Sequence, residues 1–316
     1  MKERRNSSPH KSGGTQRRRE TDPKVSSFDS RREAELRGAD SLVGLRQDTI
    51  EIIRAERLNG TIRHALFDFD GTISLLRQGW QQVMIPLMVE VLLNTPRHEP
   101  EAELQQFVEE LVTVTTGQQT IFQMMRLAEE VQKRGGKPEP PGVYKREYLA
   151  RLWEHIRGRV QAVKSGQTPP EQMMVPGAVD MLRALCDRGV RCYLASGTDE
   201  PDVRDEATAL GVAGYFAAIH GAQDVRAEDA KMVAIHAIFA EQQVRGPELV
   251  TFGDGYVEIE DTKKVGGLAV GVASDEVTRS GIDQRKRKVL IAAGADIIIP
   301  DFRNWQSLIA LLFAEG

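Results

Sequence analysis

Two acidic residues interrupt and end a strongly apolar stretch of the sequence. Residues 64–70 read HALFDFD, which places Asp68 and Asp70 directly before a Gly-Thr pair. The apolar residues around them predict a strand buried on both faces, where an unpaired carboxylate is unfavourable. Two residues apart on an extended chain, both acidic side chains point the same way. Carboxylates placed like this can serve as a nucleophile, as a proton donor or as ligands of a hard cation.

Other polar residues follow later apolar segments in the same manner. Ser196 ends the segment RCYLAS and is followed by Gly197, and Lys231 begins an apolar helical run. Asp254 ends the segment LVTFGD, and Glu258 follows one helical turn later. Ligands of open α/β sheets bind outside the carboxyl ends of the strands. We therefore expect these side chains to meet at one site.

The elements that would position these residues are strands and helices in alternation from Pro176 onward. This alternation predicts a parallel sheet with helices on both faces. The predicted strands are residues 191–196, 216–221, 249–254, 268–273 and 296–301. The strand that holds Asp68 belongs most simply to the same sheet. Before it we predict a short strand over about residues 50–55 and a tight turn at Asn59-Gly60.

Residues 79 to about 165 have a different pattern. Four segments carry apolar residues three and four positions apart, and breaks rich in Pro, Gly and Thr separate them. The pattern predicts a small bundle of four amphipathic helices, inserted between the first strand of the sheet and the others. The predicted organisation is therefore an α/β core of residues 41–78 plus 175–316, with a helical insertion at residues 79–174.

The first 40 residues differ from the rest in composition. They are rich in Arg, Ser and Gly, and residues 1–19 carry seven Lys or Arg residues against one Glu. Such a segment cannot bury enough apolar surface to fold. We interpret residues 1–40 as a disordered basic tail, either a dispensable extension or the product of a misassigned start. The alternatives are a tail that binds nucleic acid or another acidic partner, and an organelle transit peptide.

Composition limits the class of protein further. The chain of 316 residues is 41% hydrophobic and 28% charged, with a formal net charge of −4. No apolar run approaches the roughly 18 residues of a membrane span, and the N-terminal residues lack the apolar region of a secretory signal. Cys186 and Cys192 have no metal-ligand spacing. We expect a cytoplasmic protein with both thiols reduced.

Taken in order, the motifs DFDGT, LASGT, a lone Lys and FGDGYVEIED resemble those of the haloacid dehalogenase-like hydrolase superfamily. The resemblance extends over about residues 62–316 and includes the helical insertion, which looks like that family's cap domain. It implies an α/β fold with a doubly wound, Rossmann-like parallel sheet and a helical cap. An Asp at position 70 points to the phosphatases and phosphomutases of the superfamily rather than to its dehalogenases.

The resemblance also implies a role for each motif residue. Asp68 would attack phosphorus and form an aspartyl phosphate, while Asp70 would protonate the leaving alcohol and then deprotonate the attacking water. Ser196 and the amide of Gly197 would bind one phosphate oxygen. Lys231 would neutralise another.

A magnesium ion is implied by the same resemblance. Its ligands would be Asp68, the backbone carbonyl of Asp70 and Asp254. The second acid of the fourth motif is usually an Asp four residues after the first, but this chain has Glu258 there. Glu258 would hold the metal through a water, and Asp261 is the alternative second acid.

Substrate choice is expected to come from the insertion and from the loop that leads into it. The candidates are Arg77, Trp80, Gln118 and Arg126. We interpret Asp199, Glu200 and Asp202 as helix-start acids. The basic run of residues 285–288 is predicted to be a solvated helix face.

The predicted function is that of a Mg²⁺-dependent phosphatase. Its partner would be a small phosphorylated metabolite, either a sugar phosphate or a phosphoglycolate-like acid. We expect no membrane partner. A phosphomutase shares every core motif and remains an alternative. A non-catalytic binding or regulatory protein that uses the basic tail is an alternative of another class. The intact acid pair argues against it, because a binding module has no need of Asp70.

Overall fold

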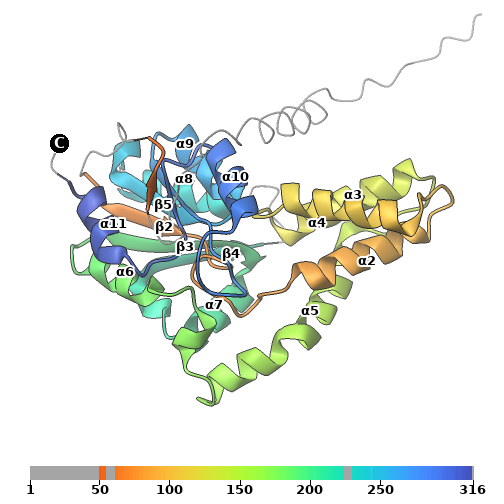
Figure 1. The fold of residues 1–316 in the computed structure, drawn as a ribbon, viewed down its shortest axis with the longest axis horizontal. Helices are drawn as coiled ribbons and strands as arrows, with labels where there is room; N and C mark the ends of the chain where they lie inside the picture. The colour runs from red at the N-terminus through yellow and green to blue at the C-terminus, as the bar shows by residue number, and fades with distance from the viewer. Residues whose placement is uncertain (1–49, 55–60, 224–229, 243, 315–316) are drawn as a thin grey trace, which may run out of the picture. The chain divides into compact units, whose positions relative to one another are not determined.

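The computed structural model describes residues 50–54, 61–223, 230–242 and 244–314. Within these ranges a seven-stranded sheet runs in the order β1-β7-β6-β5-β2-β3-β4 (Figure 1). The strands are β1 (Glu51–Ile52), β2 (His64–Phe67), β3 (Arg191–Asp199), β4 (Phe216–Ala222), β5 (Leu249–Gly253), β6 (Leu268–Val272) and β7 (Ile297–Ile299). All neighbours from β7 to β4 are parallel. This arrangement confirms the fold class expected from the sequence.

The first strand is the exception to the parallel order. β1 pairs antiparallel with β7, with Glu51 opposite Ile298. Strands β7, β6 and β5 lie between β1 and β2, so these two consecutive strands are not neighbours. β1 is also shorter than the predicted strand over residues 50–55. The predicted turn at Asn59-Gly60 falls outside the described residues.

Helices cover both faces of the sheet. They are α6 (Ala178–Cys186), α7 (Glu200–Ala209), α8 (Ala230–Gln242), α9 (Tyr256–Lys264), α10 (Gln284–Ala292) and α11 (Trp305–Leu312), with short 3₁₀ turns at residues 170–173, 213–215 and 246–248. Alternate residues of β2 pack into the apolar clusters on the two faces of the sheet. Phe67 belongs to the apolar cluster that includes Met181 of α6, whereas Leu66 belongs to the cluster that includes Ile235 of α8. β2 is therefore buried on both sides, as its apolar sequence predicts.

One basic side chain of α10 secures the edge strand. Arg287 donates from Nε to Oε2 of Glu51 at 2.9 Å, and both residues are buried. The prediction of a solvated helix face over residues 285–288 is therefore wrong for Arg287. The reason is that β1, distant in sequence, brings an acid against this helix.

Four α-helices follow β2 in the sequence, ahead of the 3₁₀ turn at residues 170–173 and α6. They are α2 (Gln81–Leu93), α3 (Glu101–Val114), α4 (Thr120–Lys133) and α5 (Pro141–Lys164), and Figure 1 shows them as one group. We call residues 81–164 the helical insertion. Along α5, the buried Tyr148, Leu152, Ile156 and Val160 are four residues apart, which gives the helix one apolar stripe to pack. The helices lie where the periodicity predicts them, and the domain limits stay a prediction.

A search of the described ranges for a helix both long and apolar enough to cross a membrane found none.

Candidate active site

The carboxyl ends of three neighbouring strands bring the motif residues together. β2 pairs with β3 on one side and with β5 on the other. Asp68 extends the pairing with β5 by donating its backbone N–H to the carbonyl of Phe252 at 2.9 Å. Asp68, Ser196 and Asp254 consequently lie at one edge of the sheet, where α/β proteins bind their ligands.

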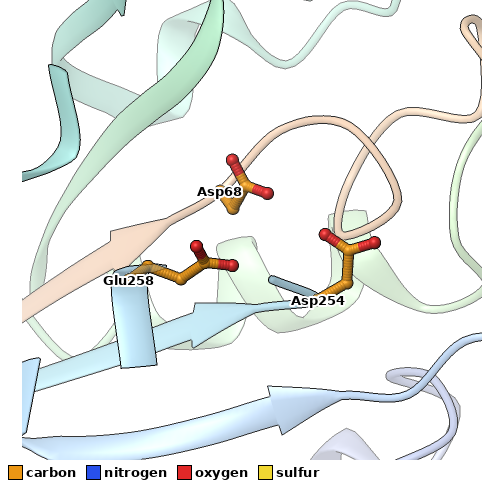
Figure 2. Close-up of side chains that lie close together, drawn as sticks. All are labelled: Asp68, Asp254 and Glu258. Carbon is orange, nitrogen blue, oxygen red and sulfur yellow. The ribbon is translucent and has the colours of Figure 1, made fainter. Parts of the chain in front are cut away.

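Three of the predicted carboxylates form a buried cluster. One carboxylate oxygen from each of Asp68, Asp254 and Glu258 lies within 4.8 Å of the others. Figure 2 shows the three side chains converging from the end of β2, the end of β5 and the first turn of α9. Their residues are only 5%, 8% and 1% exposed. Carboxylates this close together and this buried are stabilised by a nearby cation or by protonation.

The alternative second acid of the fourth motif lies outside this cluster. Asp261 pairs instead with Lys264 of the same helix, at 2.6 Å. Glu258 is held in place by the backbone N–H of Gly255, which donates to its Oε1 at 2.7 Å. The structure therefore groups Glu258, and not Asp261, with Asp68.

Lys231 supplies one positive charge to the acidic cluster. Its Nζ lies 3.2 Å from Oδ1 of Asp68 and 2.6 Å from Oε2 of Glu258, and the residue is 1% exposed. Burial raises the pKa of Asp68 well above its usual value, and the Lys231 ammonium opposes that rise. Lys231 thus connects the end of β2 with the start of α9.

Asp70 lies beside this cluster and is bound by hydroxyl groups of β3. Its Oδ2 accepts hydrogen bonds from Thr198 Oγ1 at 2.8 Å and from Ser196 Oγ at 3.4 Å. Burial raises the pKa of Asp70, while Arg77 and the two hydroxyl groups act in the opposite direction. Sequence reasoning gave Thr198 no role. Its place in the motif LASGT, directly after the expected phosphate-binding pair, was the available signal.

The loop between α3 and α4 closes tightly over two strand ends. A Cβ atom on Gly255 would lie 2.8 Å from the Cα of Gly117, and one on Gly197 would lie 3.0 Å from the carbonyl oxygen of Gln118. Gln118 also donates from its side chain to the hydroxyl of Tyr256. Backbone from the insertion approaches Gly255 too closely for a side chain, and at Gly197 a side chain would force the backbone of Gln118 to shift slightly.

A cleft between the strand ends and the helical insertion contains most of the predicted site residues. The residues that line it are Asp68, Asp70, Arg77, Trp80, Thr116, Gly117, Gln118, Thr120, Gln123, Tyr148, Leu152, Ser196, Gly197, Thr198, Lys231 and Asp254. Three of the four specificity candidates, Arg77, Trp80 and Gln118, are among them. Arg126 is not in this lining, and its guanidinium pairs with Glu129 of the same helix at 3.0 Å.

Arg77 lines the cleft, but its guanidinium is bound to α7. Nη2 and Nε donate to Oε1 of Glu206 at 2.7 and 3.0 Å, and Nη2 lies 3.3 Å from Asp202. Burial alone would lower the pKa of Arg77, but the neighbouring carboxylates outweigh it and raise the pKa. Nε is also 3.9 Å from Oδ1 of Asp70. Asp202, predicted to be a helix-start acid, therefore also helps to hold a cleft residue.

A second lysine, which is half-buried, contacts the cluster through Asp254. Lys286 Nζ lies 2.8 Å from Oδ2 of Asp254 and 2.7 Å from Oε1 of Glu276. Burial alone would lower the pKa of Lys286, but these two carboxylates raise it. The prediction of a solvated helix face is thus also wrong for Lys286, because α10 points this side chain at the end of β5.

The fold and the site together define an α/β protein with a cluster of carboxylates at the carboxyl edge of a parallel sheet. The sequence model of the haloacid dehalogenase-like hydrolases matches residues 62–266, well over half of the chain. The chain therefore belongs to the haloacid dehalogenase-like hydrolase family. This match confirms the family expected from the motifs, and with it that the protein is an enzyme.

Comparison with solved structures supports the same fold. A predicted phosphoglycolate phosphatase from Haemophilus somnus 129PT superposes with a TM-score of 0.52 at 17% identity, over 78% of this chain and 98% of that one. A beta-phosphoglucomutase from Clostridium difficile gives 0.53 at 14% identity, over 79% and 99%. A predicted phosphatase from Clostridium acetobutylicum gives 0.50 at 15% identity, over 79% and 99%. At these identities the likeness shows a shared fold. A search of curated proteins found no match.

Proposed function

We propose that this enzyme is a Mg²⁺-dependent phosphatase that hydrolyses a small phosphomonoester through an aspartyl phosphate on Asp68. The observation that supports this most is the meeting of Asp68, Asp70, Ser196 and Lys231 in one cleft. Phosphoryl transfer needs a nucleophile, a proton donor for the leaving oxygen and positive charge near the phosphate oxygens. These four side chains offer all three.

The buried acids fit a magnesium ion. Asp68, Asp254 and Glu258 offer hard carboxylate oxygens within 4.8 Å of one another, which is the ligand type that Mg²⁺ prefers. We assign direct contacts to Asp68, Asp254 and the backbone carbonyl of Asp70. Glu258 already binds Lys231 and the Gly255 amide, which supports an action through water. When bound, the cation supplies positive charge that draws the phosphate to the carboxylates.

The chain's own residues carry the two chemical steps. A carboxylate oxygen of Asp68 forms a bond to phosphorus as the bond from phosphorus to the ester oxygen breaks, and Asp70 gives that oxygen a proton. Water then attacks the phosphorus, Asp70 takes the water's proton, and inorganic phosphate leaves with Asp68 restored. Ser196 and the Gly197 amide hold one phosphate oxygen, and Lys231 neutralises another.

The lining of the cleft favours a sugar phosphate over a phosphoglycolate-like acid. Among the described lining residues, the cations are Arg77 and Lys231. Lys231 is assigned to the transferred phosphoryl group, and Glu206 and Asp202 already bind Arg77. A second acidic group of a substrate would therefore meet Arg77, a cation that two carboxylates already neutralise.

The remainder of the lining suits a neutral, hydroxylated leaving group. It offers hydroxyl, amide and aromatic groups, from Trp80, Thr116, Gln118, Thr120, Gln123 and Tyr148. Such groups hydrogen-bond and stack against sugars or polyols without demanding charge. In this proposal the helical insertion serves as the cap that selects the leaving group.

Hydrolysis of a generic aryl phosphate, measured with and without Mg²⁺, tests the proposed reaction. A panel of phosphorylated metabolites then tests the substrate class, and we expect kcat/KM to be higher for sugar phosphates than for phosphoglycolate. Absence of Mg²⁺-dependent phosphate release from the whole panel would refute the proposal. Transient retention of a bisphosphorylated intermediate would instead indicate a phosphomutase, which has the same core motifs.

A further inference from the structure

Lys286 contacts one carboxylate oxygen of the proposed metal ligand Asp254. Its Nζ is 2.8 Å from Oδ2 of Asp254, 2.7 Å from Oε1 of Glu276 and 3.3 Å from Oγ of Ser274. The side chain is 14% exposed. The ammonium thus has oxygen partners on three different residues, which hold it against Asp254.

The first motif lies against the same oxygen of Asp254 that Lys286 contacts. A Cβ atom on Gly71 would lie 2.2 Å from Oδ2 of Asp254 and 3.1 Å from Oε1 of Glu276. Ser274 donates from Oγ to the carbonyl of Gly71 at 2.7 Å. The ammonium of Lys286 and the backbone of Gly71 therefore both confine Oδ2 of Asp254. One of its oxygens is committed to Lys286, which leaves the other for a cation.

We propose that Lys286 is a positioning residue that restricts Asp254 to binding a cation through one oxygen, and that this restriction makes the site prefer Mg²⁺ to Ca²⁺. The inference rests on the proposed function, because it requires a cation at the acidic cluster. Mg²⁺ demands a near-octahedral shell and uses few carboxylates, whereas Ca²⁺ takes six to eight oxygens and accepts both oxygens of one carboxylate. A carboxylate with one oxygen committed elsewhere therefore disfavours the larger ion.

Titration calorimetry of the full-length protein with Mg²⁺ and with Ca²⁺ tests this role without relying on catalysis. The variant Lys286→Met removes the bond to Asp254, and Lys286→Arg keeps a cationic donor there. Removing a positive charge raises the affinity for both ions alike. The ratio of the Ca²⁺ affinity to the Mg²⁺ affinity therefore measures how Lys286 positions the Asp254 carboxylate. Arg285→Met is the matched control, because it removes a cation from an exposed position on the same helix.

We expect Lys286→Met to raise the Ca²⁺-to-Mg²⁺ affinity ratio about tenfold, within the range that changes beside a metal ligand produce. Arg285→Met should leave the ratio at the parent value, and Lys286→Arg should return it toward that value. Lys286→Met also leaves Glu276 buried without its cation. If that variant fails to fold, the double variant Lys286→Met/Glu276→Gln carries the test, because it removes both partners together.

A parent protein that binds Mg²⁺, with a Lys286→Met variant whose Ca²⁺-to-Mg²⁺ affinity ratio equals the parent's, would overturn the role of Lys286 while leaving the proposed function in place. A parent protein that binds neither ion and releases no phosphate would overturn the proposed function itself.

Discussion

Replacing Gly255 with alanine should separate closure of the helical insertion from stability of the core. Gly255 has φ −102° and ψ 166°, an extended conformation that alanine adopts without strain. The new Cβ would lie 2.8 Å from the Cα of Gly117, so the loop between α3 and α4 must move. Overpacking of this kind costs about 1–3 kcal/mol. We expect turnover to depend on this contact, so kcat/KM should fall about 5- to 150-fold.

The assay is the steady-state rate on an aryl phosphate at saturating Mg²⁺, together with the thermal melting temperature. Gly255→Ala also brings the new methyl group within 3.2 Å of the Glu258 carboxylate. Gly197→Ala avoids this, because its Cβ would meet the backbone of Gln118 and Gln119. We expect both variants to lose activity while their melting temperatures change little, because the insertion can move away from the core.

Gly158→Ala on α5 is the matched control. A Cβ there would meet nothing within 4 Å, so activity should be unchanged and the helix slightly more stable. Parent-like kcat/KM in both Gly255→Ala and Gly197→Ala would show that the tight contact with the insertion has no part in turnover.

Three further predictions concern the metal, the edge of the sheet and the N-terminal tail. Asp254→Ala should weaken activation by Mg²⁺ strongly. Glu258→Ala should weaken it about 10- to 100-fold, and the activity of this variant should recover at saturating Mg²⁺. A titration of initial rate against Mg²⁺ that gives the reverse order would contradict our assignment. Arg287→Met leaves Glu51 buried without its partner and should lower the free energy of unfolding by about 3–5 kcal/mol. Urea unfolding measures this decrease, and a decrease no larger than that of the exposed Arg285→Met variant would contradict the prediction. Removal of residues 1–40 should leave activity and melting temperature almost unchanged, and a large loss of either would show that the tail belongs to the folded unit.

Local pattern was enough to predict the main elements and most of the cleft. The strands of the core and the four inserted helices have the periodicities that their packing requires. Asp68, Ser196 and Asp254 could be placed together because the carboxyl ends of parallel strands share one edge.

The residues that were misjudged depend on contacts between distant parts of the chain. Lys286 and Arg287 belong to a run of four basic residues, which in isolation is typical of a solvated face. Only the fold shows that Asp254 and Glu51 lie against them. The pairing of β1 with β7 was missed for the same reason, since strand order is a tertiary property. Arg126 was chosen for its charge and its place near a loop, but its orientation on α4 depends on bundle packing.

The central claim is that Asp68 carries the phosphoryl group during turnover. The most direct measurement is intact-protein and peptide mass spectrometry of the enzyme, quenched in acid during turnover of a phosphate ester with Mg²⁺ present. We predict a fraction of the protein heavier by one phosphoryl group, with that group located on Asp68. Asp68→Asn should fold normally but show neither the adduct nor turnover, because the amide cannot attack phosphorus. An adduct on another residue, or an Asp68→Asn variant with about half of the parent rate, would contradict the account, since loss of a covalent nucleophile lowers the rate by orders of magnitude.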